Sequence, residues 1–104
     1  MKYLETESFR KDLRALAKRG HSQDFVLGFR EKFVPAAERY AAERGAPWPA
    51  GLRVKSVTNA PGVWEFTWSM NNPDGRATFE WITIDGAPAI RLRRVGDHSI
   101  FSKP

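Results

Sequence analysis

The segment PGVWEFTWSMNNPDGRATFEW, residues 61–81, decides how this chain folds, because two runs with a period of two residues flank one polar turn. In VWEFTWS (63–69) large apolar rings alternate with polar side chains, and RATFEWITI (76–84) repeats the alternation. NPDG (72–75) lies between them and is a strong turn signal. The pattern predicts two antiparallel strands, each with one apolar and one polar side. The apolar sides carry Trp64, Phe66, Trp68, Ala77, Phe79 and Trp81.

Two further runs extend this pair into a meander. LRVKSV (52–57) precedes the turn signal NAPG (59–62), and AIRLRR (89–94) follows the DG turn at 85–86. In both runs, branched apolar residues alternate with Arg or Lys. The second half of the chain therefore predicts about four consecutive antiparallel strands, with one face covered and one face open.

The first half has the period of helices. Residues 2–6 are expected to form a short strand, and Ser8 to cap a helix that ends at Gly20. A second helix is expected from Ser22 to Gly45, with its apolar stripe interrupted at Pro35, where a kink or two abutting helices are predicted. The fold class is thus α+β, with two helices packed on one face of the sheet. Residues 1–104 are expected to form a single domain.

Composition narrows the classes of function. A chain of 104 residues, 41% of them hydrophobic, is long enough to bury one hydrophobic core without disulfide bonds or a structural metal ion. It has no cysteine, which excludes disulfides, a thiol nucleophile and thiolate metal sites. His21 lies in the turn between the helices without a third ligand nearby in sequence, so no metal site and no cofactor are expected. Neither a secretory signal nor a membrane span is apparent, and we expect a cytoplasmic protein without a membrane partner.

The clustered aromatic rings allow three interpretations: a stacking platform for bases, a ligand pocket or a hydrophobic core. The strand sides that carry the rings carry no charge, which favours packing beneath the helices. An indole at the sheet margin can still contact a ligand, so that alternative stays open.

Charge points to the other face of the sheet. The net charge is +5 and the isoelectric point is near 10, a balance that favours a polyanionic partner. The polar strand sides collect five cations beside only two carboxylates, Glu65 and Glu80. These cations are Arg53, Lys55, Arg76, Arg91 and Arg93. Such a face is either a phosphate-binding groove or ordinary solvated surface.

The order of elements, together with GVWEFTW (62–68), GRATF (75–79) and RRVGDHSIF (93–101), resembles the RelE/ParE superfamily of bacterial toxins, especially its RelE- and HigB-like mRNA interferases. The resemblance covers nearly the whole chain. It implies a RelE-like fold and a ribosome-dependent endoribonuclease that cuts translated mRNA without a metal or cofactor. It also implies a cognate antitoxin protein as partner.

In the reaction that the resemblance implies, the ribose 2′-OH attacks the adjacent phosphate. Such chemistry needs a base, cations around the phosphorane and an acid for the leaving oxygen. Glu65 is the candidate base, as the only carboxylate on its strand. Arg76 matches the position of the family's phosphate-stabilising arginine, and His98 lies near the C-terminus, where members often place an acid or base. Arg53, Lys55, Arg91 and Arg93 would hold the RNA backbone.

Several alternatives remain at this stage. Glu65 can be a surface ion-pair partner, and His98 a residue without chemistry. Phe101 occupies the place where several family members use a tyrosine. Because phenylalanine has no hydroxyl, a mechanism that uses a phenol is disfavoured, and His98 and Glu65 become the stronger candidates. A ParE-like inhibitor of DNA gyrase and a non-catalytic nucleic-acid- or protein-binding module are the competing functions.

Overall fold

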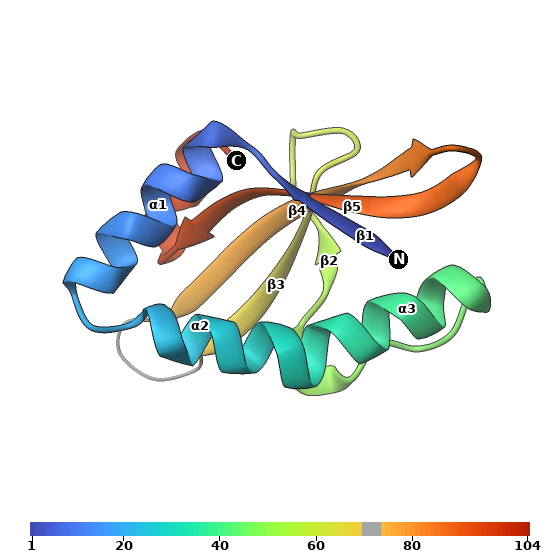
Figure 1. Cartoon of the computed structure of the whole chain (residues 1–104), viewed down its shortest axis with the longest axis horizontal. Helices are drawn as coiled ribbons and strands as arrows, with labels where there is room; N and C mark the ends of the chain where they lie inside the picture. Colours follow the sequence, from blue (N-terminus) through green and yellow to red (C-terminus); the bar gives the residue numbers. More distant parts are fainter. Residues whose placement is uncertain (70–73) are drawn as a thin grey trace.

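The computed structural model describes residues 1–69 and 74–104, and these form a mixed sheet with helices on one face (Figure 1). The strand order is β1-β5-β4-β3-β2. The strands are β1 (Lys2–Glu5), β2 (Lys55–Ser56), β3 (Trp64–Ser69), β4 (Gly75–Ile84) and β5 (Ala87–Gly96). The helices are α1 (Glu7–Lys18), α2 (Ser22–Gly28) and α3 (Val34–Ala42).

The expected meander is confirmed: β2, β3, β4 and β5 pair antiparallel in chain order. The short N-terminal strand is also confirmed, and it pairs parallel with β5 at the sheet edge. The strand expected over 52–57 is wrong for its first half. Residues 50–52 form a short 3₁₀ turn, and Arg53 follows it in the left-handed region with φ 49°. The chain therefore turns before it can enter the sheet at Lys55.

Thr6, and not Ser8, caps α1. Its hydroxyl accepts a hydrogen bond of 3.0 Å from the Phe9 amide and donates one of 2.8 Å to the Arg93 carbonyl. One side chain thus closes the helix start and joins it to β5. The helix ends at Lys18, two residues before the expected stop at Gly20, whose φ of 80° suits a residue without a Cβ.

The second helical segment is interrupted as expected near Pro35, but by a wide turn. A π-helical turn at Phe29–Phe33 joins α2 to α3, and the Val34 amide bonds to the carbonyl of Phe29. Pro35, which has no amide hydrogen to donate, lies in the first turn of α3. The interruption therefore removes fewer backbone hydrogen bonds than a proline in the middle of a regular helix would.

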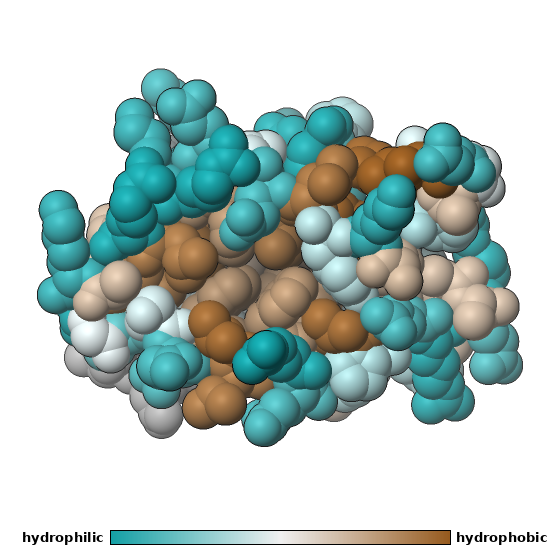
Figure 2. Space-filling model, in the orientation of Figure 1, coloured by the Kyte–Doolittle hydropathy of each residue, from teal (hydrophilic) through white to brown (hydrophobic). Residues whose placement is uncertain are grey.

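The aromatic rings of β3 and β4 pack beneath the helices, which confirms the core interpretation for most of them. Phe66 and Phe79 are fully buried, and the Phe33 ring from the π-helical turn stacks on Phe66 with centroids 4.1 Å apart. Trp64, Trp68 and Trp81 are only half-buried at the margins. On the face drawn in Figure 2, apolar side chains gather in the hollow between α1 and the α2–α3 segment. Half of the turn predicted at 72–75, residues 72 and 73, falls outside the described residues.

Candidate nucleic-acid interface

The polar sides of β3, β4 and β5 form one continuous surface, called here the outer face, on the side of the sheet opposite α2 and α3. Cross-strand register brings its residues together. Arg76 of β4 lies between Thr67 of β3 and Gly96 of β5, and Glu65 lies opposite Thr78. Glu65 and Arg76 are therefore diagonal neighbours on the same face.

Arg76 is held in place at one end of the outer face. Only 12% of its side chain is exposed, and its Nη1 donates to Thr67 Oγ1 at 2.9 Å and to Asp74 Oδ1 at 2.8 Å. Its backbone is held as well, because the Trp68 indole donates to the Arg76 carbonyl at 2.9 Å. A guanidinium fixed in this way is preorganised to meet an anion, with little side-chain entropy left to lose.

Glu65 is half-buried near the middle of β3. Its cross-strand neighbours are Lys55 on β2 and Thr78 on β4. Within residues 1–69 and 74–104, no ion pair to Glu65 is found, so the interpretation of Glu65 as one half of a surface salt bridge gains no support. Lys55 lies on the outer face beside it, whereas Arg53 precedes the strand and does not share the alternation.

His98 opens the short 3₁₀ helix His98–Ser102 immediately after β5, and its side chain is exposed. The Phe101 ring meets the imidazole edge-on, with centroids 5.0 Å apart. Asp97 caps this helix by accepting a 2.8 Å hydrogen bond from the Ser99 amide. Hydrogen bonding to Ser99 lowers the pKa of Asp97, so a carboxylate stays ionised next to His98.

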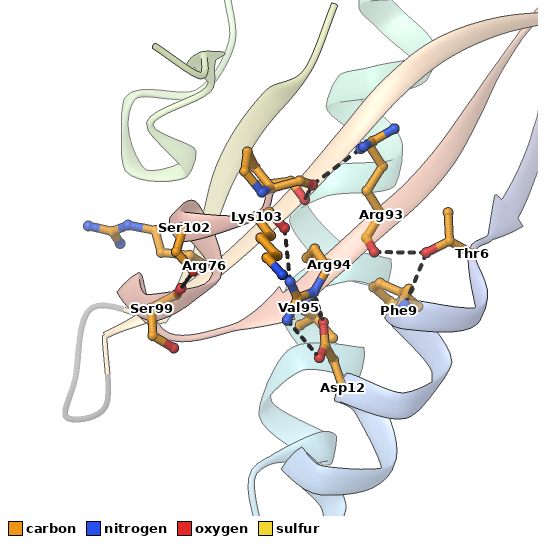
Figure 3. Close-up of polar contacts among 12 residues, drawn as sticks. Thr6, Phe9, Asp12, Arg76, Arg93, Arg94, Val95, Ser99, Ser102 and Lys103 are labelled. Carbon is orange, nitrogen blue, oxygen red and sulfur yellow. Dashed lines mark hydrogen bonds and ion pairs between the residues drawn. The ribbon is translucent and has the colours of Figure 1, made fainter. Parts of the chain in front are cut away.

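The short helix brings His98 to the same end of the sheet as Arg76. It packs on β4 and β5, and a Cβ added to Gly96 would lie 3.1 Å from a methyl group of Ile100. Gly96 is the cross-strand partner of Arg76. Figure 3 shows Arg76 beside the Ser99–Ser102 turn. Arg76 and the start of the His98–Ser102 helix thus lie at the same end of the sheet, and Glu65 is a diagonal neighbour of Arg76 on the adjacent strand.

Arg91 and Arg93 form an ion cluster with Glu80 farther along the outer face. Arg93 Nη1 lies 2.7 Å and Arg91 Nη2 3.3 Å from the Glu80 carboxylate. Burial alone would raise the pKa of Glu80, but hydrogen bonds from the two guanidinium groups, with their positive charges, hold it below its usual range. The cluster carries two cations and one anion, so its excess positive charge is smaller than the sequence pattern implies.

The outer face is less open than the sequence pattern predicts, because the C-terminal segment returns across it. Thr78 Oγ1 donates to the Pro104 main-chain oxygen at 3.0 Å, and Arg93 Nε donates to the same atom at 3.2 Å. Thr78 is fully buried as a result. The return is possible because the His98–Ser102 helix reverses the chain after β5.

Arg94 is a structural cation that the strand alternation missed. A bulge in β5 leaves Arg93 without a partner opposite β4, since Thr78 pairs with Arg94 and Phe79 with Leu92. Arg94 Nε and Nη2 bind the Asp12 carboxylate of α1 at 2.6 and 3.2 Å, and the Val95 amide donates to it at 3.1 Å (Figure 3). The two consecutive arginines were the signal for a bulge, because strict alternation would have turned the second one into the core.

No group of three or more His, Cys, Asp or Glu side chains suited to a metal ion occurs among the described residues. Over the same residues, none of the helices combines the length and the apolar character needed to cross a membrane.

The arrangement of elements is also found in a solved toxin structure. The solved structure of a YoeB/ParE toxin from Agrobacterium tumefaciens superimposes with a TM-score of 0.65 over 94% of this chain and 99% of that one, at 13% sequence identity. No protein-family model matches the chain, and no sequence match to curated proteins was found. At this level of identity the similarity establishes the fold, which confirms the resemblance at the level of architecture.

Proposed function

We propose that this protein is the toxin of a bacterial toxin–antitoxin system and acts in the cytoplasm as a metal-independent, ribosome-dependent mRNA endoribonuclease. The observation that supports the proposal is the placement of Glu65 diagonal to Arg76 on a cation-bearing sheet face, with His98 two residues after Gly96, the cross-strand partner of Arg76, on a RelE/ParE fold. A base, a fixed cation and a group able to donate a proton are what 2′-OH attack on a phosphodiester requires.

In the proposed reaction Glu65 accepts the proton of the ribose 2′-OH, whose oxygen then attacks the adjacent phosphorus. Arg76 stabilises the negative charge that develops on the phosphorane. His98 donates a proton to the departing 5′-oxygen, a general-acid role that histidine side chains commonly fill. The products are a 2′,3′-cyclic phosphate and a free 5′-hydroxyl.

RNA binding in this proposal uses the remaining cations of the outer face. Lys55 lies beside Glu65, whereas Arg91 and Arg93 lie beyond Thr78 and share Glu80. Arg53 would reach the RNA from outside the sheet. An acidic segment of a cognate antitoxin would neutralise the protein by covering the same cations.

The test is induced expression in a bacterial host, with growth followed and mRNA 5′ ends mapped. Wild type should arrest growth and create new ends at translated codons. Arg76→Ala and His98→Ala should each lower cleavage by about 100-fold, the lower bound of what positioned acid–base and electrostatic groups supply. Arg30→Ala and His21→Ala, which alter residues on the helical side, serve as matched controls and should cleave like wild type.

The competing functions give different results in the same experiment. Growth arrest with intact mRNA would favour a ParE-like gyrase inhibitor. A binding module predicts that Glu65→Gln and His98→Ala leave the phenotype unchanged, whereas Arg91→Ala weakens it. If wild type neither arrests growth nor cleaves mRNA, the proposed enzyme activity is wrong.

A further inference from the structure

A cavity of about 320 Å³ opens on the helical side of the sheet, away from the outer face. It lies between the C-terminal end of α3, the start of β3 and the β4–β5 hairpin. In Figure 1 the end of α3 and this hairpin lie toward the same end of the molecule. Its lining includes the rings of Tyr40, Trp64 and Trp81, the Arg44 side chain and Thr83. Nothing in the proposed cleavage reaction uses these residues.

The aromatic rings of the lining pack against one another, and these rings are called here the aromatic wall. Tyr40 stacks on Trp81 with centroids 5.7 Å apart and planes inclined by 30°, and it stacks on Trp48 at 5.0 Å and 26°. Trp64 meets Tyr40 at 6.3 Å from the side. Because each ring is held by its neighbours, a planar ligand would spend little binding free energy on rearranging the rings.

Among the described residues, Arg44 is the only charged side chain that lines the cavity. In residues 1–69 and 74–104 no carboxylate pairs with it, and none lines the cavity. A guanidinium beside apolar rings selects a ligand with a planar apolar part and an anionic group.

We propose that this cavity binds one nucleotide, with its base against the aromatic wall and its phosphate on Arg44. Aromatic side chains that stack bases, next to cations that hold the backbone, are the usual means of recognising single-stranded nucleic acid. The Thr83 hydroxyl, which can donate or accept, is available to a base edge. The volume accommodates a single nucleotide better than a peptide segment, whose backbone would need a continuous groove.

The inference goes beyond the proposed cleavage and does not depend on it. It concerns the opposite side of the sheet and predicts binding, which can be measured when no RNA is cut. A nucleotide held there would give the protein a second contact with its nucleic-acid partner, separate from Arg76.

The experiment is a titration of the ¹⁵N-labelled protein with adenosine 5′-monophosphate, adenosine or ribose 5-phosphate, observing the indole N–H resonances by NMR. The Trp81 indole N–H is buried and has no hydrogen-bond partner among the described residues, so its resonance reports on the ring surroundings. The monophosphate should shift the Trp64 and Trp81 resonances and leave Trp68 unchanged. Adenosine should bind about tenfold more weakly, because it lacks the charge-assisted contact.

The decisive variant is Arg44→Gln, which alters a surface side chain and should fold normally. It should weaken binding of the monophosphate about tenfold and leave adenosine binding unchanged. Arg39→Gln, on α3 and outside this cavity, is the control. Equal binding of ribose 5-phosphate, or no effect of Arg44→Gln, would overturn the proposal. If an acidic tryptophan-containing dipeptide bound more tightly than adenosine 5′-monophosphate, the proposal would also be overturned, in favour of a protein-docking site.

Discussion

At the residue scale, the four arginines near the outer face occupy different chemical environments. Arg76 is nearly buried against Thr67 and Asp74, Arg91 and Arg93 share one carboxylate, and Arg94 is bound to Asp12. A count of charges treats these four as equivalent. The contacts distinguish three situations. Arg76 is held in place by Thr67 and Asp74, whereas Arg91 and Arg93 belong to one ion cluster. Arg94 attaches α1 to the sheet through Asp12.

The Glu80 cluster gives a pH-dependent prediction. The pKa of Glu80 is lower in the folded protein than its ordinary value of 4.5. Its ionised form therefore stabilises the fold above about pH 4.5, and this contribution is lost as the pH falls through the lower folded pKa. Glu80→Gln should destabilise the protein by about 1 kcal/mol at pH 7, and the difference from wild type should shrink at pH 3.

Urea unfolding of both proteins at the two pH values measures this difference. Glu43→Gln, at an exposed position after α3, is the control and should differ little from wild type at either pH. A gap between wild type and Glu80→Gln that stays constant from pH 7 to pH 3 would show that ionisation of Glu80 contributes nothing to folding.

At the scale of elements, the β3–β4 pair depends on one close contact. Gly75 opens β4 beneath the Trp68 indole, and a Cβ built on Gly75 would lie 2.4 Å from an indole carbon. The same indole donates to the Arg76 carbonyl, so the glycine lets Trp68 hold the first residues of β4. This contact thereby connects the half-buried Trp68 ring to the position of the candidate catalytic arginine.

Gly75→Ala should therefore displace the Trp68 indole. We expect a loss of about 1–3 kcal/mol in the free energy of unfolding, which is typical of overpacking, and a red shift of tryptophan fluorescence. Gly51→Ala is the matched control, because a Cβ there meets nothing within 4 Å. Equal stability and identical spectra for the two variants would mean that the contact between Gly75 and Trp68 is unimportant.

At the scale of the whole molecule, the net charge of +5 is distributed over both faces of the sheet. The outer face carries Lys55, Arg91 and Arg93, and the helical side carries Arg44 at the cavity. If the protein binds RNA as proposed, much of the affinity comes from release of counterions and must fall as salt is added.

Binding of a 2′-deoxy-substituted RNA oligonucleotide, which cannot undergo 2′-OH attack, should weaken linearly on a logarithmic salt scale. Lys55→Ala should lower the magnitude of the slope by about 0.7, the value for one phosphate contact with a single strand. Fluorescence anisotropy at several salt concentrations provides the measurement, with Lys11→Ala on α1 as control. Affinity that does not change with salt would contradict a phosphate-binding outer face.

The sequence by itself determined the strand order of the meander, the helical first half and which rings enter the core. Each follows from a local regularity: alternation in 63–69 and 76–84, turn signals at 59–62 and 85–86, and helical spacing up to Gly45. Such regularities are visible in sequence because each element must present one apolar side to the same core. The resemblance to the RelE/ParE superfamily rested on the same order of elements.

Only the tertiary structure decided how the charged groups are used. The β5 bulge before Arg94, the return of the C-terminal segment to Thr78 and the cavity beside Arg44 all involve residues far apart in the chain. Polar side chains tolerate many environments, so their pattern in sequence constrains their partners weakly. Apolar side chains are most favourable in the buried core, and for that reason their pattern alone predicted where they lie.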